Sequence, residues 1–257
     1  MQLNFVYIIK LLCMNTYIKL RVCILIFFTI FLFGCEKDEL TYTVKVNFNI
    51  GINQESDQQT YLILRKGVIA LKGVTFLGMR EQGENIFFET RPDKSHGTYI
   101  ISAGQSAQYI TYFDIPQGVY NLMKWDITID EIDDDLFDEK NVDSDDYGFL
   151  VSGIYTKLDG TNIPIFFTIN PSEDLSCEAK NTNGITPISI KEGNTYTLLI
   201  ELNPSLAIDG IDRDYFEKAI IETDDEDKYI LVSSETNVNL HQLFLFRLEK
   251  TLKATVQ

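Results

Sequence analysis

The stretch YITYFDIPQGVYNLMKWDITI, residues 109–129, carries the clearest fold signal in the chain. Tyr109–Ile115 alternates its side chains between two faces, as a half-buried β-strand does. Pro116 presets a turn and Gly118 supplies a free backbone angle, so the chain is expected to reverse there. A longer strand then follows over Asn121–Ile129. Two apolar strands joined by such a turn indicate a β fold.

The same strand pattern recurs on both sides of this stretch. Val44–Ile50 alternates apolar and polar residues, and many short strands with turn signals but no alternating helices predict an antiparallel β-sandwich. We expect it to occupy residues 41–257, as one large domain or two fused ones. Ser172–Thr186, which includes Cys177, is predicted to be a loop. Further strands are expected at Tyr61–Arg65, Val68–Leu77, Ile86–Glu89, Thr98–Ser102, Gly148–Thr156, Asn162–Ile169, Thr195–Leu202 and Tyr229–Val232.

Helices are expected only near the C-terminal end. Asp209 can cap a short helix, with Asp212 as its capping-box partner. Asn237 or Asn239 can cap a second helix over about residues 238–254, where apolar residues recur at spacings of three and four. The fold class predicted is therefore all-β, with a short C-terminal helix that packs on the sandwich. The residues expected to share one face of the first helix are Tyr215, Phe216, Ala219 and Ile220.

Composition limits the classes of partner. The chain has 257 residues, of which 45% are hydrophobic, so it can form a substantial core. It has 22 basic and 38 acidic residues, a net charge of −16. A surface this acidic repels phosphate backbones and anionic headgroups, so we expect no nucleic-acid partner and no direct contact with anionic lipid.

The N-terminal region has the layout of an export signal. Lys19 and Arg21 precede Val22–Phe33, an apolar run that is too short for a spanning helix, which needs roughly 20 residues. A start at Met14 would give a signal of ordinary length. We therefore expect an export signal here.

The end of the apolar run, Leu32-Phe33-Gly34-Cys35, resembles the lipobox of bacterial lipoproteins, although Phe33 departs from the small residue usual at its position. The resemblance implies a signal peptide over residues 1–34 and a lipidated Cys35. Residues 35–40 form a charged tether that resembles the tag for export to the outer face of the outer membrane in Bacteroidota. An uncleaved anchor and a periplasm-facing position are the alternatives.

The Pro-x-Gly-x-Tyr turn at residues 116–120 also carries a family resemblance. With its flanking apolar strands, it resembles the Ig-like and transthyretin-like sandwich domains of Bacteroidota outer-membrane lipoproteins of unknown function. The likeness covers Val68–Ile129 and implies a β-sandwich.

Residues 126–146 contain 11 acidic side chains and are predicted to form a solvated excursion between strands. Asp143, Asp145 and Gly148 match the first, third and sixth positions of a calcium loop, but the twelfth position lacks its glutamate, so this is no EF-hand. Asp143, Asp145 and Asp146 are kept as a candidate calcium set. A purely solvated loop and a site for a basic partner are the alternatives. No other cofactor is expected.

Catalytic motifs do not occur in the sequence, which has no nucleophile elbow, no His-Glu-x-x-His and no phosphate-binding glycine loop. His96 and His241 lack metal-ligand spacing. Cys177 is expected to be an unreactive thiol. Trp125 lies inside a predicted strand, so we expect a core residue rather than a sugar-stacking platform.

These observations predict a function in the cell envelope without catalysis. The favoured class is a binding module for a glycan or a protein. The alternative is an adhesin or pilus-type subunit, which would exchange a strand with a neighbour. A terminal helix, which leaves no strand to donate, argues against that alternative. A hydrolase is the least favoured class.

Overall fold

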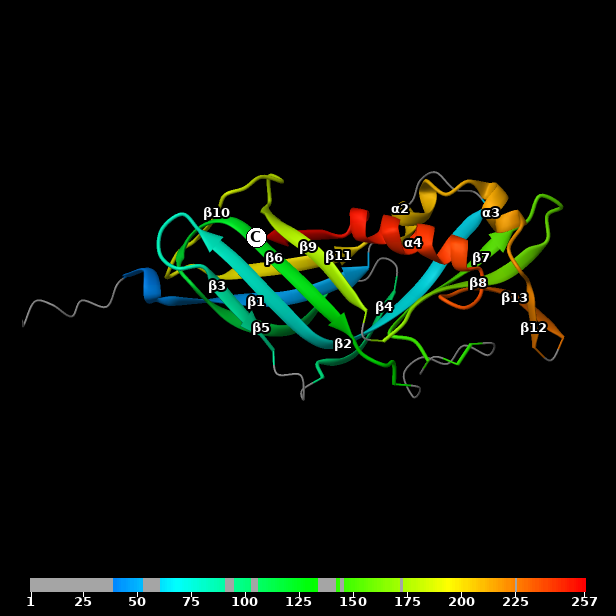
Figure 1. Cartoon of the computed structure of the whole chain (residues 1–257), viewed down its shortest axis with the longest axis horizontal. Coiled ribbons are helices and arrows are strands. Elements are labelled where there is room, and N and C mark those ends of the chain that lie inside the picture. The colour runs from blue at the N-terminus through cyan, green and yellow to red at the C-terminus, as the bar shows by residue number, and fades with distance from the viewer. Residues whose placement is uncertain are drawn as a thin grey trace, which may run out of the picture. The chain divides into compact units, whose positions relative to one another are not determined.

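A computed structural model describes residues 39–52, 61–90, 95–102, 106–133, 142–143, 146–171, 173–224 and 226–257. Thr43–Gln257 forms one compact unit, drawn in Figure 1. The predicted signal peptide, Cys35 and the tether up to residue 38 lie outside the described residues. In the described ranges, no helix is long and apolar enough to cross a membrane.

The described residues form a mostly β structure with helices near its C-terminal end (Figure 1). A short 3-10 turn, η1 (Glu39–Thr41), precedes the first strand. The helices are α2 (Pro204–Asp209), α3 (Arg213–Glu217) and α4 (Val238–Thr251). The strands are β1 (Thr43–Ile52), β2 (Leu62–Arg80), β3 (Ile86–Glu89), β4 (Gly97–Ser102), β5 (Gln108–Pro116), β6 (Gly118–Ile129), β7 (Phe149–Thr156), β8 (Asn162–Ile169), β9 (Asp174–Asn181), β10 (Ile188–Ile190), β11 (Tyr196–Leu202), β12 (Glu222–Asp224), β13 (Asp227–Val232) and β14 (Lys253–Val256).

Strand β2 is continuous over 19 residues, where two separate strands were predicted. Its first half pairs with β7 and its second half with β6. Both neighbours lie at the same edge, because Ala70 donates to the carbonyl of Gly148 and accepts from the N–H of Asp130. A Cβ at Gly148 would collide with the Ile129 side chain and the Asp130 carbonyl, so glycine is required where the two strands meet.

The second half of β2 belongs to a sheet that curls into a half-barrel, in the order β2, β6, β9, β14, β11, β1, β5. Strand β3 pairs with β2 at the edge opposite β6. The curl brings β3 close to β5, because the rings of Phe88 and Phe113 have centroids 5.2 Å apart. An aromatic cluster therefore spans the seam between these two edge strands.

Trp125 lies at the centre of this half-barrel. It is fully buried, with its ring 4.4 Å from Phe76 and 6.2 Å from Phe48. The prediction that Trp125 is a core residue is confirmed.

The first half of β2 continues into a second group of strands, β7, β8, β13 and β12. One face of this group carries the helices. Phe244 of α4 packs 4.8 Å from Phe167 of β8, and Phe216 of α3 packs 5.6 Å from Tyr155 of β7. The helices thus bury apolar faces on this half of the sheet, as the amphipathic spacing in α4 predicts.

The opposite face of these strands has a small core of its own. Val68, Leu150 and Phe166 are buried there together with Ile132 and Val142, which come from the acidic stretch. Ile127 and Ile129, which belong to β6, are buried as well. The prediction that residues 126–146 form a solvated excursion is therefore wrong at these four positions. Apolar residues within a charged segment stabilise the fold by burying their surface against an apolar sheet face, while the charged side chains beside them stay in water.

The predicted antiparallel sandwich is confirmed only as a mostly β fold. The sheet is mixed, because β1 pairs with β11, β9 with β14 and β8 with β13 in parallel. Parallel neighbours need long crossover connections, and here α2, α3 and β12 lie before β13 in the chain, while α4 lies before β14. The partner of such a strand lies far away in sequence and cannot be read from local turn signals.

Two further predictions near the C-terminal end are wrong. The predicted loop at Ser172–Thr186 contains β9, whose Leu175, Cys177 and Ala179 point into the core. The helix predicted over about residues 238–254 ends at Thr251, and its last residues instead form β14. Both strands have small or few apolar side chains, so their period-two signal is weak.

Helix capping also differs from the prediction. Asp209 is the last residue of α2, which is capped by Asn203 through a bond from the N–H of Leu206. Asp212 caps α3 alone, by accepting from the N–H of Asp214.

The aromatic cluster gives a stability test. We expect Phe76→Ala to lower the free energy of unfolding by about 3–5 kcal/mol, because it leaves a cavity beside Trp125. Phe87→Ala on the neighbouring strand is the matched control, since Phe87 is 67% exposed, and it should change stability by less than about 0.5 kcal/mol. Urea unfolding of both variants measures this. Equal losses would show that the ring cluster does not stabilise the half-barrel.

Candidate functional site

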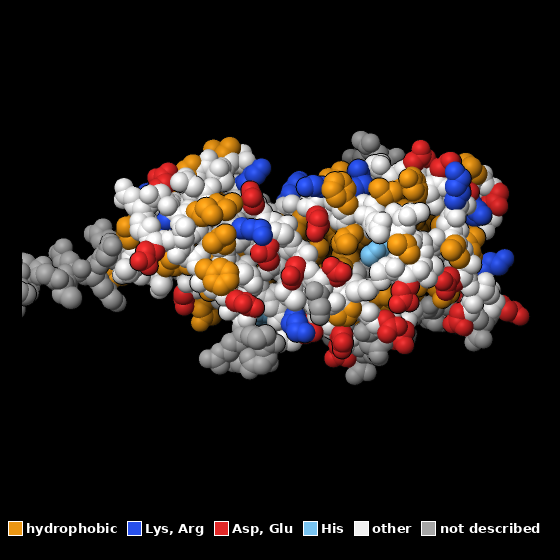
Figure 2. Space-filling view, in the orientation of Figure 1, with side chains coloured by type: hydrophobic (Ala, Val, Ile, Leu, Met, Phe, Trp, Pro, Cys, Tyr) orange, Lys and Arg blue, Asp and Glu red, His pale blue; other side chains and the backbone are white. Residues whose placement is uncertain are grey.

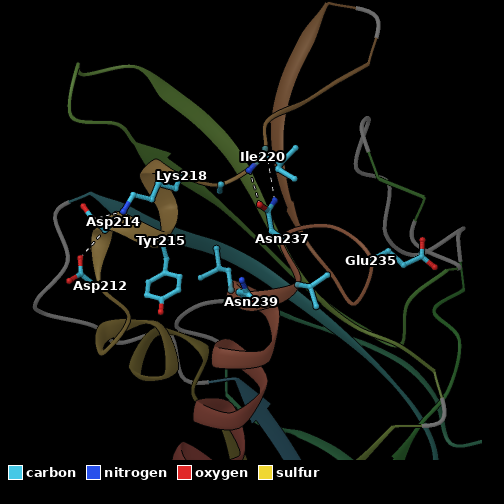
Figure 3. A pocket seen from close by; sticks show the side chains of 11 residues that line it. Asp212, Asp214, Tyr215, Lys218, Ile220, Glu235, Asn237 and Asn239 are labelled. Carbon is cyan, nitrogen blue, oxygen red and sulfur yellow. Dashed lines mark hydrogen bonds and ion pairs between the residues drawn. The ribbon is translucent and has the colours of Figure 1, made fainter.

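A groove of about 640 Å³ lies between α3 and the start of α4 (Figure 3). Its walls come from three segments: α3, the chain that follows α3, and the loop and first turn that open α4. The residues that line it are Asp212, Asp214, Tyr215, Lys218, Ala219, Ile220, Glu235, Asn237, Val238, Asn239 and Leu240.

Asn237 fixes the two sides of the groove to each other. Its side-chain oxygen accepts from the N–H of Ile220 at 2.7 Å, and its side-chain nitrogen donates to the carbonyls of Ile220 at 3.1 Å and Leu231 at 2.7 Å (Figure 3). The residue has a left-handed backbone, with φ of 56°, which asparagine tolerates better than most residues. The groove is therefore held in shape before any ligand arrives.

Asn237, one of the two predicted candidates, is the N-cap residue of α4, but its side chain does not make the expected capping hydrogen bond. Its amide is instead bound to Ile220 and Leu231. The first N–H groups of a helix have no partner within the helix. Those of Val238, Asn239 and Leu240 belong to residues that line the groove.

Helix α3 is held at its other side by a polar network. The Glu217 carboxylate accepts from the Tyr155 hydroxyl at 2.5 Å and from the N–H of Leu158 at 2.9 Å. Arg213 donates to the carbonyl of Thr156 at 2.8 Å. The Tyr155 bond is the largest cause that lowers the pKa of Glu217, so the carboxylate stays charged. This network attaches α3 to the β7–β8 hairpin.

Three apolar side chains remain exposed around the groove. Ile220 is 62% exposed, Tyr215 45% and Val238 39%. The prediction that Tyr215, Phe216, Ala219 and Ile220 share one helix face is wrong, because α3 ends at Glu217. Phe216 is buried, whereas Tyr215 and Ile220 are exposed. Large apolar side chains exposed together mark interaction surfaces more often than single ones do.

The charge around the groove is acidic. Lys218 is paired with Asp214 at 2.9 Å, while Asp212 and Glu235 form no ion pair among the described residues. Burial raises the pKa of Tyr147 to about 12, and the carboxylates of Asp146, Glu235 and Glu222 act in the same direction. Figure 2 shows acidic side chains spread over this face, densely so on the half that carries α3, β12 and β13.

The candidate calcium set is only partly visible. Asp143 and Asp146 are exposed, and Asp145 lies outside the described residues. Within the described ranges, no three His, Cys, Asp or Glu side chains come together as a metal site. The calcium set stays a prediction, and the glycine of its motif, Gly148, has the packing role described above.

The other candidate residues are buried in separate places. Cys177 is a free thiol in the core, and burial raises its pKa to about 12, which keeps it protonated at neutral pH. His96 is half-buried, and burial lowers its pKa. His241 on α4 lies against β8, with Nε2 3.0 Å from the Thr168 carbonyl. None of these residues lines the groove.

Comparison with known proteins identifies no relative, because no family model, curated protein or solved structure matches the chain. The groove was not predicted from the sequence. Its apolar residues have no helical or strand period, and the asparagine before α4 is a local signal for a helix cap rather than for a groove.

His241 gives a pH test. Burial lowers its pKa in the folded protein, while the unfolded chain binds a proton near pH 6.5. The free energy of unfolding should therefore fall as the pH drops below about 6.5 and level off below the folded-state pKa. Urea midpoints at pH 7.5 and 5.0 measure this. His241→Gln should lose less stability between these values than the wild type, and an equal loss in both would contradict the assignment.

Proposed function

We propose that this chain is a lipid-anchored lipoprotein of the outer membrane that faces the cell exterior and acts as a non-catalytic binding module for a protein. The observation that carries the binding role is the groove, where exposed apolar side chains surround a preformed hollow. Buried apolar anchors in a pocket supply most of the binding energy in protein interfaces. The lipobox-like Cys35 and the acidic tether support the location.

A glycan ligand is the second candidate and would use a different surface. Tyr109 and Tyr112 of the edge strand β5 are both exposed, and they pair with Asn49 and Asn47 of β1, so all four side chains share one face. Exposed aromatic rings beside amides suit sugar stacking. Tyr112 already has the Lys45 ammonium 3.9 Å from its ring centroid, which occupies one of its faces. The protein-binding groove is therefore the favoured site.

The adhesin or pilus-type alternative depends on a strand that is free to leave. The terminal helix that argued against it is followed by β14, but β14 pairs with β11 on one side and β9 on the other. Removing β14 would break its hydrogen-bond ladders with both β11 and β9. This pairing favours the binding module over strand exchange.

The groove gives the first test in cells. The photo-crosslinking residue p-benzoylphenylalanine replaces Ile220 in one strain and Ile63 in another. Ile63 is 61% exposed and lies on β2, away from the groove lining, so it matches Ile220 in exposure. We expect a discrete protein adduct from position 220, at least about tenfold stronger than from position 63. No adduct, or equal adducts at both positions, would refute a protein-binding groove.

The anchor gives the second test. Cys35→Ala removes the acylated thiol, and the acyl chains supply about 0.8 kcal/mol per buried CH₂. We expect the variant to move from the membrane fraction to the soluble or secreted fraction. Protease added to intact cells should digest the wild-type protein. A variant that stays in the membrane indicates an uncleaved anchor, and protection until lysis indicates a periplasm-facing position.

A further inference from the structure

We propose that the groove binds an extended, cationic protein segment, with an apolar side chain in the hollow and a lysine or arginine beside it. This inference rests on the proposed function and specifies its ligand. Three properties of the groove carry it: exposed apolar walls, an excess of carboxylates over cations at the rim, and a helix start without a side-chain cap.

The apolar walls select an apolar side chain. Tyr215 and Ile220 stand around the hollow in Figure 3, and Val238 also lines it. Burying these three side chains against a partner would remove their apolar surface from water. Asn237 fixes the chain at Ile220, so this segment loses little conformational entropy when a partner binds. A preformed wall of this kind suits a short segment of a partner better than a broad, flat surface.

The rim selects positive charge. Lys218 pairs with Asp214, and its charge also interacts with Asp212. Among the described residues, Glu235 forms no ion pair. Asp212 and Glu235 lie at opposite margins of the groove in Figure 3, with the Glu235 side chain directed outward, so negative charge flanks the groove on both sides. The net charge of −16 draws cationic partners toward the molecule and repels acidic ones.

The start of α4 selects a peptide backbone over a simple cation. The N–H groups of its first turn favour a hydrogen-bond acceptor, and the acidic rim disfavours a negatively charged acceptor. A neutral backbone carbonyl meets both conditions. An extended segment presents such carbonyls between its side chains, so apolar, cationic and backbone groups can all be satisfied by one strand-like ligand.

The test uses the full-length protein in detergent micelles and a fluorescein-labelled 12-residue peptide that alternates lysine and leucine. Fluorescence anisotropy measures its affinity. Two peptide controls replace every lysine by glutamate or every leucine by serine. We expect both controls to bind at least about tenfold more weakly than the parent peptide, because each removes one of the two required contacts.

Protein variants locate the binding. Ile220→Ser and Glu235→Gln should each weaken the parent peptide about fivefold or more, since both alter the groove. The matched controls are Ile63→Ser and Glu249→Gln, two exposed residues outside the groove, and they should change affinity less than twofold. Ile220 and Ile63 are both exposed, so neither substitution opens a cavity in the core.

The outcomes separate this inference from the proposed function. If groove and control variants lose affinity equally, binding is diffuse electrostatic attraction and the inference fails. If the serine-substituted peptide binds as well as the parent, the groove takes a bare cation and the inference also fails. A position-220 crosslink in cells that the alternating peptide does not compete away would overturn the cationic ligand and leave the protein-binding function standing.

Discussion

The length of β2 is the constraint on which the rest of the structure depends. One strand runs through both halves of the unit, and two different strands, β6 and β7, follow each other along one of its edges. The half-barrel and the helix-covered half therefore share a continuous backbone. Gly148 permits the close approach where the two neighbours meet, so a local steric requirement of one residue determines how the two halves join.

The two halves bury their apolar surface in different ways. The half-barrel closes around aromatic rings, with Trp125 in contact with side chains from several strands. The other half uses helices on one face and part of an acidic segment on the other. This second arrangement leaves a rim of helix ends and loops, and the groove forms there. A preformed hollow is thus a consequence of covering an open sheet with short helices.

Much of the β structure follows from the sequence. Val44–Ile50 and Asn162–Ile169 alternate or continue as apolar runs, and they lie in β1 and β8. The prediction fails where the side chains are small, as at Cys177 and Ala179 in β9, or where the strand is short, as in β14. The prediction misses the parallel pairing for another reason. Strands β8 and β13 become neighbours only after the helices between them in sequence have packed.

The groove is harder to predict than any strand. Ile220 looks like a core residue by type, and its exposure depends on α3 ending three residues earlier. Asn237 looks like a cap, and its amide instead binds two carbonyls and an N–H of other segments. In both cases the local pattern was real, but the tertiary contacts that decide the outcome involve residues up to 17 positions away.

The place of β14 bears on how the protein reaches its folded state. Strands β9 and β11 are joined only through β14, which lies between them in the sheet, although both come earlier in the chain than residues 253–256. Strand β1 likewise cannot form its parallel ladder until β11 is present, about 150 residues later in the chain. Sheets with such distant partners form slowly, because the chain must close large loops first. The half-barrel can therefore be completed only after residues 253–256 are available to pair with both neighbours.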